Sequence, residues 1–70
     1  MPLITIDTIE GILSKELKQE LSTALTNTVA EVLGEKIKPN TWVIINEAPE
    51  GNFSIGGHQL TANAVKKAMK

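Results

Sequence analysis

The chain has 70 residues, a formal net charge of -1 and no cysteine, which excludes disulfides and thiolate metal sites. Its one histidine, His58, has no carboxylates at ligand spacing around it, so we expect neither a metal nor another cofactor. The near-neutral charge argues against nucleic acid or an anionic membrane as a partner, because both require a basic surface. We find no signal peptide and no apolar run long enough to span a bilayer, and we expect a cytoplasmic protein.

The short length also bears on stability. A compact chain of about 60 residues buries only roughly 60% of the surface that its unfolded form exposes. Small domains compensate with disulfides, a metal or self-association, and only the last is open here. Hydrophobic residues make up 41% of the chain and supply the surface for it. We therefore expect an obligate oligomer.

The first two predicted elements are a strand and a long helix. In residues 3–9, Ile4 and Ile6 alternate with polar residues, which is the pattern of a strand with one buried face. Ser14 is a suitable N-cap for a helix over 15–33, which we expect Gly34 to end in the left-handed conformation. Its apolar positions form one stripe and its polar residues lie mainly off it, so we expect the latter to be exposed: Lys18, Gln19, Glu20 and Glu31.

After a short polar loop that Pro39 and Asn40 close, the second half of the chain predicts a strand, a hairpin arm and a short helix. Residues 42–46 are almost continuously apolar, which is typical of a strand covered on both faces. Residues 53–57 fit one arm of a hairpin, and the tail from Leu60 is rich in helix formers. The fold class is therefore α/β, one βαβ unit with a right-handed crossover. Two strands are not stable alone, so another copy should cover the second face of the sheet.

Pro2 is the first candidate for chemistry. We expect the initiator methionine to be trimmed, which leaves Pro2 with a free secondary amine. An α-amino group titrates near pH ~8, and desolvation or a nearby cation lowers that pKa. A neutral amine can act as a general base. The alternative is that Pro2 only starts a strand, which on this residue alone is the more common case.

Several segments together resemble the 4-oxalocrotonate tautomerase family, in order and at consistent spacings. They are Met1 to Ile6, Ile9-Glu10-Gly11, the long helix, Val43 to Glu47, and Gly51 to Gly57. The resemblance implies one tautomerase-like domain over residues 1–70 and proton transfer beside a carbonyl. It also implies a homohexamer, a trimer of dimers, with its sites at subunit junctions. Pro2 would be the catalytic base and Phe53 a wall of the pocket.

The chain departs from that family at two positions. Two arginines of the family grip substrate carboxylates, one after the Glu-Gly pair and one at the start of the second strand. Here those positions hold Ile12 and Trp42, and the chain has no arginine at all. Losing one such preorganised donor lowers the rate on the order of 10²–10³-fold in a studied hydrolase. We therefore do not expect the dicarboxylate reaction of the namesake enzymes.

Three interpretations of this departure remain open. The small-molecule substrate is a more apolar keto–enol compound, held by Ile12, Trp42 and Phe53. Alternatively, Lys36 or Lys38 of a neighbouring subunit supplies the cation. Or the chain is a non-catalytic hexamer that binds a small molecule, or one subunit of a mixed hexamer with an arginine-bearing partner.

The other polar and aromatic candidates have simpler interpretations. Trp42 fits a core or interface anchor better than a ligand wall on general aromatic usage. His58 is expected in a solvated loop, and Glu10 and Glu47 at the surface or an interface. Lys66 and Lys67 are expected in a solvated tail.

Overall fold

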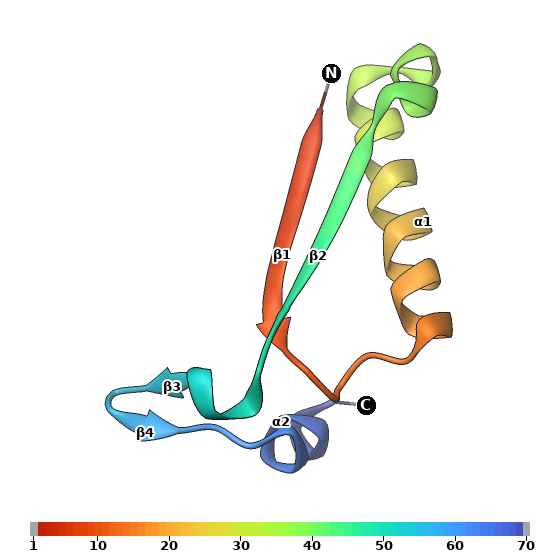
Figure 1. The fold of residues 1–70 in the computed structure, drawn as a ribbon. Helices are drawn as coiled ribbons and strands as arrows, with labels where there is room; N and C mark the ends of the chain where they lie inside the picture. The colour runs from red at the N-terminus through yellow and green to blue at the C-terminus, as the bar shows by residue number, and fades with distance from the viewer. Residues whose placement is uncertain (1, 70) are drawn as a thin grey trace.

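The computed structural model describes residues 2–69, so the expected removal of Met1 concerns a residue outside this range. The predicted α/β order is confirmed, with a βαβ unit followed by a hairpin and a short helix (Figure 1). Its elements are β1 (Leu3–Ile9), α1 (Lys15–Leu33), η1 (Glu35–Asn40), β2 (Trp42–Ala48), η2 (Glu50–Asn52), β3 (Ser54–Ile55), β4 (His58–Gln59) and α2 (Ala62–Ala68). β1 and β2 are parallel, with Leu3 opposite Trp42 and Ile9 opposite Ala48.

The ends of α1 follow from two residues that the sequence marks. The Ser14 hydroxyl accepts a hydrogen bond of 3.1 Å from the backbone N–H of Leu17, as an N-cap does. Gly34 ends the helix as predicted, and its N–H donates to the Ala30 carbonyl at 2.8 Å. The predicted left-handed conformation is wrong, because Gly34 has φ +107° and an extended ψ of 152°. The reason is that Gly34 also begins η1, where its carbonyl accepts from Ile37 at 3.3 Å.

The segment before β2 is a 3₁₀-helix rather than the predicted loop. η1 covers Glu35–Asn40 and is closed by the Thr41 hydroxyl, which donates to the Ile37 carbonyl at 3.0 Å. The strand that follows is two residues longer than predicted and ends at Ala48. η1 therefore determines where β2 begins, which is beside the start of β1.

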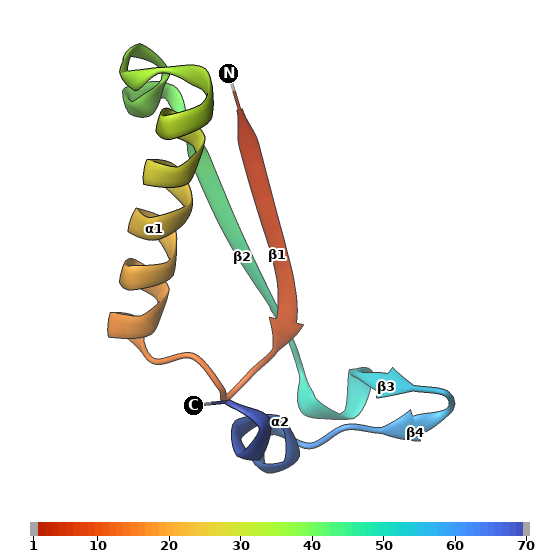
Figure 2. The same ribbon diagram turned by 180° about the vertical axis from the view of Figure 1, so that it is seen from behind.

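The two faces of the β1–β2 sheet differ in cover. α1 lies along one face (Figures 1 and 2), where Ile4, Ile6, Val43 and Ile45 are half-buried. On the other face Leu3 is 58% exposed, Trp42 56% and Ile44 42%. Within a single chain β2 is therefore covered on one face only. The cover that we predicted for its second face does not come from residues of the same chain.

One polar residue of α1 is not directed to solvent as predicted. The Lys18 ammonium forms an ion pair with the Glu47 carboxylate of β2 at 2.5 Å. Lys18 therefore lies on the side of α1 that packs against the sheet, and both side chains are partly buried. The sequence pattern missed this because Lys18 adjoins the apolar stripe, where a long stem packs while its charged end finds a partner.

A single chain exposes more surface than a compact monomer does. Its accessible surface is 5313 Å², whereas a compact monomer of this mass exposes about 4300 Å². Its radius of gyration is 14.5 Å, against about 11 Å for a compact domain of this length. Among residues 2–69 only Ile9 and Ala30 are fully buried. The core within one chain is thus small, as expected for a subunit of a larger assembly.

None of the helices in residues 2–69 is long and apolar enough to cross a membrane.

Candidate active site

Pro2 and Trp42 lie together at the amino end of the sheet. Pro2 is half-buried and directly precedes β1, and Trp42 is the first residue of β2. The Trp42 backbone N–H donates to the Pro2 carbonyl oxygen at 2.9 Å. This bond extends the strand ladder by one step and fixes the Pro2 backbone beside β2.

Ile12 and Phe53 lie at the opposite end of the sheet. Ile12 is in the turn between β1 and α1, and Phe53 is between η2 and β3; both are half-buried. β1 has seven residues, and a strand of that length spans about 20 Å. One chain therefore brings Pro2 near Trp42 and places Ile12 and Phe53 at the far end. The four predicted pocket residues do not meet within a single chain.

The far end is built from the turn after β1 and from the hairpin arm. Glu10 continues the ladder, since its N–H donates to the Ala48 carbonyl at 2.9 Å. Phe53 begins the arm, and its carbonyl accepts from the Leu60 N–H at 2.9 Å. This bond closes the base of the predicted hairpin, so the backbone of Phe53 is held by the returning strand.

Sequence reasoning missed one contact between distant segments here. The Glu50 carboxylate accepts a hydrogen bond of 2.6 Å from the Ala62 N–H at the start of α2. No local pattern marks this contact, because the two residues are 12 apart in the chain.

The two candidate lysines, Lys36 and Lys38, lie in η1 and are exposed. They are close in sequence to Trp42, and the Lys38 carbonyl accepts from the Thr41 N–H at 3.2 Å. The Lys38 side chain lines a groove of about 280 Å³ along α1, together with Gln19, Ser22, Thr23, Thr26 and Asn27. In a single chain Lys38 therefore turns along α1, and Pro2 is not among the residues of that groove.

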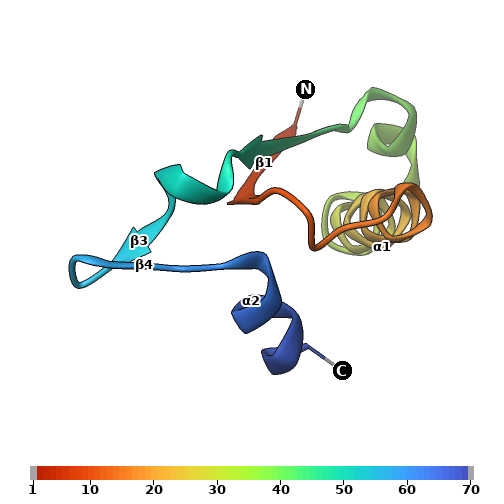
Figure 3. The ribbon, with the colours of Figure 1, turned by 60° about the horizontal axis from the view of Figure 1, so that its bottom comes forward.

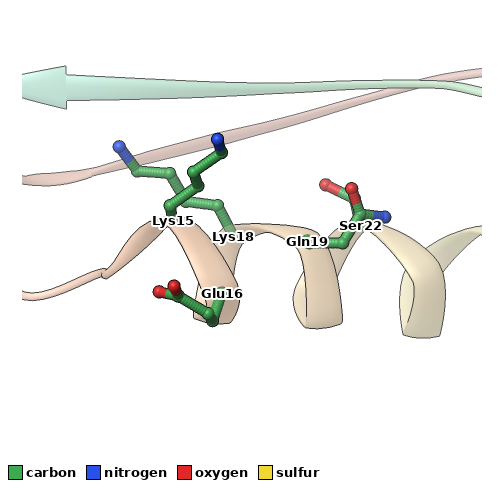
Figure 4. Close-up of a pocket in the computed structure, with 5 residues that line it drawn as sticks. All are labelled: Lys15, Glu16, Lys18, Gln19 and Ser22. Atoms are coloured by element: carbon green, nitrogen blue, oxygen red, sulfur yellow. The ribbon is translucent and has the colours of Figure 1, made fainter.

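A larger hollow lies beside the first half of α1. It has a volume of about 640 Å³ and is lined by Lys15, Glu16, Lys18, Gln19 and Ser22. Lys15 and Lys18 point towards the strands, whereas Glu16 points away (Figure 4). None of the predicted site residues lines this hollow, which lies along a polar flank of α1. We do not assign the candidate site to it.

His58, Glu10, Lys66 and Lys67 are exposed, as expected for surface residues. His58 lies in β4 of the hairpin rather than in a loop. The Glu47 carboxylate is half-buried because of its ion pair with Lys18.

Several known proteins are similar to this chain in sequence and in fold. The family model described as "Tautomerase enzyme" matches residues 2–63. The structure of apo "unFused 4-OT" is 39% identical, with a TM-score of 0.74, over 91% of this chain and 98% of that one. TomN, a 4-oxalocrotonate tautomerase homologue of tomaymycin biosynthesis, is 31% identical, with a TM-score of 0.76, over 96% and 95%.

A third similar structure is a heterohexameric 4-oxalocrotonate tautomerase from Chloroflexus aurantiacus J-10-fl. It is 27% identical, with a TM-score of 0.74, and the match covers 100% of both chains. A search of curated proteins by sequence finds no match. The family match over most of the chain and the shared βαβ fold lead to one conclusion: this chain belongs to the tautomerase family, as a divergent member of its 4-oxalocrotonate tautomerase group.

Proposed function

We propose that the chain is a tautomerase that moves a proton within a small keto–enol compound, with Pro2 as the general base. Membership of the tautomerase family supports this class of activity. The observation that carries the proposal is the setting of Pro2. Its carbonyl is engaged by Trp42, while its nitrogen precedes β1 and becomes a free amine when Met1 is removed. The proposal treats residues 1–70 as one tautomerase-like domain that works in the cytoplasm.

The chemistry needs only a proton and a neutral amine. The Pro2 nitrogen removes a proton from an enol hydroxyl or from a carbon beside a carbonyl. It then returns that proton to another carbon, so no electrons leave the substrate. A free α-amine has a pKa near ~8, and a desolvated site lowers that pKa by disfavouring the charged form. Partial burial of Pro2 supports such a site.

The proposed substrate is more apolar than a dicarboxylate. Ile12 and Trp42 hold positions where family members carry arginine, and Phe53 supplies a further apolar wall. Without guanidinium groups the pocket cannot grip two carboxylates bidentately. The Trp42 indole offers an apolar surface and one N–H donor for a carbonyl oxygen. A small aryl keto–enol compound fits this lining.

We further propose that this pocket closes between copies of the chain in a homohexamer, a trimer of dimers. Pro2 and Trp42 lie at one end of the sheet, whereas Ile12 and Phe53 lie at the other. Neighbouring copies that run in opposite directions would bring these two ends together. The exposed sheet face and the large surface of a single chain support such an assembly. A similar protein is itself described as a heterohexamer.

A non-catalytic role is the second candidate, and the absence of arginine favours it. The chain would then be a tautomerase-fold hexamer that binds a small molecule, or one subunit of a mixed hexamer. In the mixed assembly a partner chain would carry the arginines. Purification from the native source, followed by mass spectrometry of the intact subunits, distinguishes one chain from two.

The test compares the ketonisation of an aryl enolpyruvate by the wild type and by Pro2→Ala. Intact mass first establishes that Met1 has been removed in both proteins. Pro2→Ala keeps a free primary amine but loses the secondary amine that the ring holds in place, so we expect kcat/KM to fall by up to roughly 100-fold, the lower end of what a well-placed general base contributes. Pro39→Ala is the matched control, because Pro39 is exposed and lies within η1. Equal rates for the wild type and Pro2→Ala would overturn the proposed mechanism and leave the non-catalytic role.

A further inference from the structure

Glu50 is the residue that joins the hairpin arm to α2. Its carboxylate oxygen Oε2 accepts a hydrogen bond of 2.6 Å from the backbone N–H of Ala62, the first residue of α2. The N-cap residue Thr61 serves a different donor, the N–H of Ala64 at 3.1 Å. The Ala62 contact is charge-assisted, and a carboxylate at the first turn also complements the helix dipole.

The Glu50 contact closes a loop that carries Phe53. Between Glu50 and Ala62 the chain runs out into the hairpin and returns (Figure 3). Two further bonds hold this loop, Leu60 N–H to the Phe53 carbonyl and the Gln59 side-chain amide to the Gly51 carbonyl, each 2.9 Å. Phe53 therefore sits within a closed unit whose two ends are joined by the Glu50 carboxylate.

The same unit bears on the turn that carries Ile12. Gly11, the preceding residue, has φ +92°, and a Cβ atom built on it would lie 3.3 Å from the Cβ of Ala62. This approach is tighter than ordinary van der Waals contact. The turn after β1 thus lies close to Ala62, the same residue whose backbone N–H donates to Glu50. Gly11 allows both the positive φ and the close approach.

From these contacts we infer that Glu50 is a positioning residue that holds the two apolar walls, Ile12 and Phe53, as one unit. The inference rests on the proposed function, which makes those two residues walls of the pocket. If Ile12 and Phe53 are already in place before the substrate binds, binding does not have to order them. The loss of Glu50 should therefore weaken substrate affinity rather than slow the proton transfer. Glu50 itself acts through Ala62 and touches no substrate.

The test compares Glu50→Ala, Glu50→Gln and Thr61→Ala in the full chain. We expect Glu50→Ala to raise KM for the aryl enolpyruvate about fivefold, the factor given by ~1 kcal/mol, with kcat changed less than about twofold. Glu50→Gln keeps an acceptor oxygen and should recover much of that loss. Thr61→Ala removes the other cap of α2 and is the matched control for helix stability alone. Sedimentation verifies that all variants assemble as the wild type does.

A second readout does not depend on activity. In Glu50→Ala, amide hydrogen exchange should become faster at Ala62 and also across residues 10–13. In Thr61→Ala, exchange should become faster at Ala64 and stay unchanged across residues 10–13. Unchanged exchange at 10–13 in Glu50→Ala overturns the coupling of the two walls. Faster exchange with an unchanged KM, or equal KM changes in Glu50→Ala and Thr61→Ala, overturns the positioning role. If the wild type has no Pro2-dependent activity, the proposed function fails, and the exchange comparison still decides whether Glu50 couples the walls.

Discussion

The backbone N–H of Trp42 donates a 2.9 Å hydrogen bond to the carbonyl oxygen of Pro2, so the residue before β1 and the first residue of β2 are held side by side. A residue at position 42 is thereby fixed near the proposed base, whatever its side chain. In this chain that side chain is an indole, 56% exposed at the end of the sheet. The character of position 42 should therefore control which substrates the proposed site accepts.

The first prediction concerns substrate choice. Trp42→Arg places a guanidinium at the end of the sheet that holds Pro2, where it can bind a substrate carboxylate bidentately. We expect kcat/KM for a dicarboxylate enol to rise about tenfold, the factor for a charged hydrogen bond of ~1.4 kcal/mol. Activity towards an aryl enolpyruvate should fall, because the apolar surface of the indole is lost. Steady-state kinetics with both substrates measures the switch.

Trp42→Lys is the matched control for this switch. It adds the same charge without the planar fork, so it should gain less dicarboxylate activity than Trp42→Arg. A gain of equal size in both variants would show that charge alone matters. No gain in either would remove position 42 from the proposed pocket.

The second prediction concerns the uncovered sheet face. Ile44 is 42% exposed there in a single chain, and the proposed assembly buries it against another copy. Ile44→Lys should then dissociate the multimer, because an unpaired ammonium in an apolar interface is strongly unfavourable. Asn27→Lys adds the same charge at an exposed position of α1 and should leave the assembly intact. Sedimentation velocity measures the size of the assembly that each variant forms. If Ile44→Lys forms an assembly of the same size as the wild type, the interface does not include this sheet face.

The third prediction concerns the end of α1. Gly34 has φ +107°, and no atom lies within 4 Å of a Cβ built there. Gly34→Ala should therefore lower the free energy of unfolding by about 1–3 kcal/mol through backbone strain alone. Gly51 has equally open space and no positive φ, so Gly51→Ala should change that free energy by less than about 1 kcal/mol. Urea unfolding at one fixed protein concentration compares the two, and equal effects would contradict the strain argument.

Local signals in the sequence were enough for β1 and for the two ends of α1, although they missed the 3₁₀-helix η1. The alternation around Ile4 and Ile6 predicted β1, and Ser14 and Gly34 predicted the ends of α1, because strand period and helix caps depend on neighbours in the chain. Contacts between distant segments were not predictable in the same way. The bond from Ala62 to Glu50 depends on how the arm folds back, which no spacing rule records.

The candidate site shows the same division. The residues of the proposed pocket came from a resemblance to a family, and they stay a prediction. The parallel register of β1 and β2, which the predicted βαβ order already implied, places Pro2 and Phe53 at opposite ends of the sheet within one chain.

The most direct test of the central claim is a pH titration of the chain labelled with ¹⁵N-proline, followed by NMR of the proline nitrogens. The chain has three prolines, and the nitrogens of Pro39 and Pro49 are amides that cannot titrate, so they serve as internal controls. We predict that the Pro2 nitrogen alone titrates, with a pKa below the ordinary value of ~8, because desolvation in the proposed pocket would disfavour the charged amine. A Pro2 nitrogen that does not titrate, or one whose pKa is at or above that value, would contradict the account of Pro2 as the catalytic base.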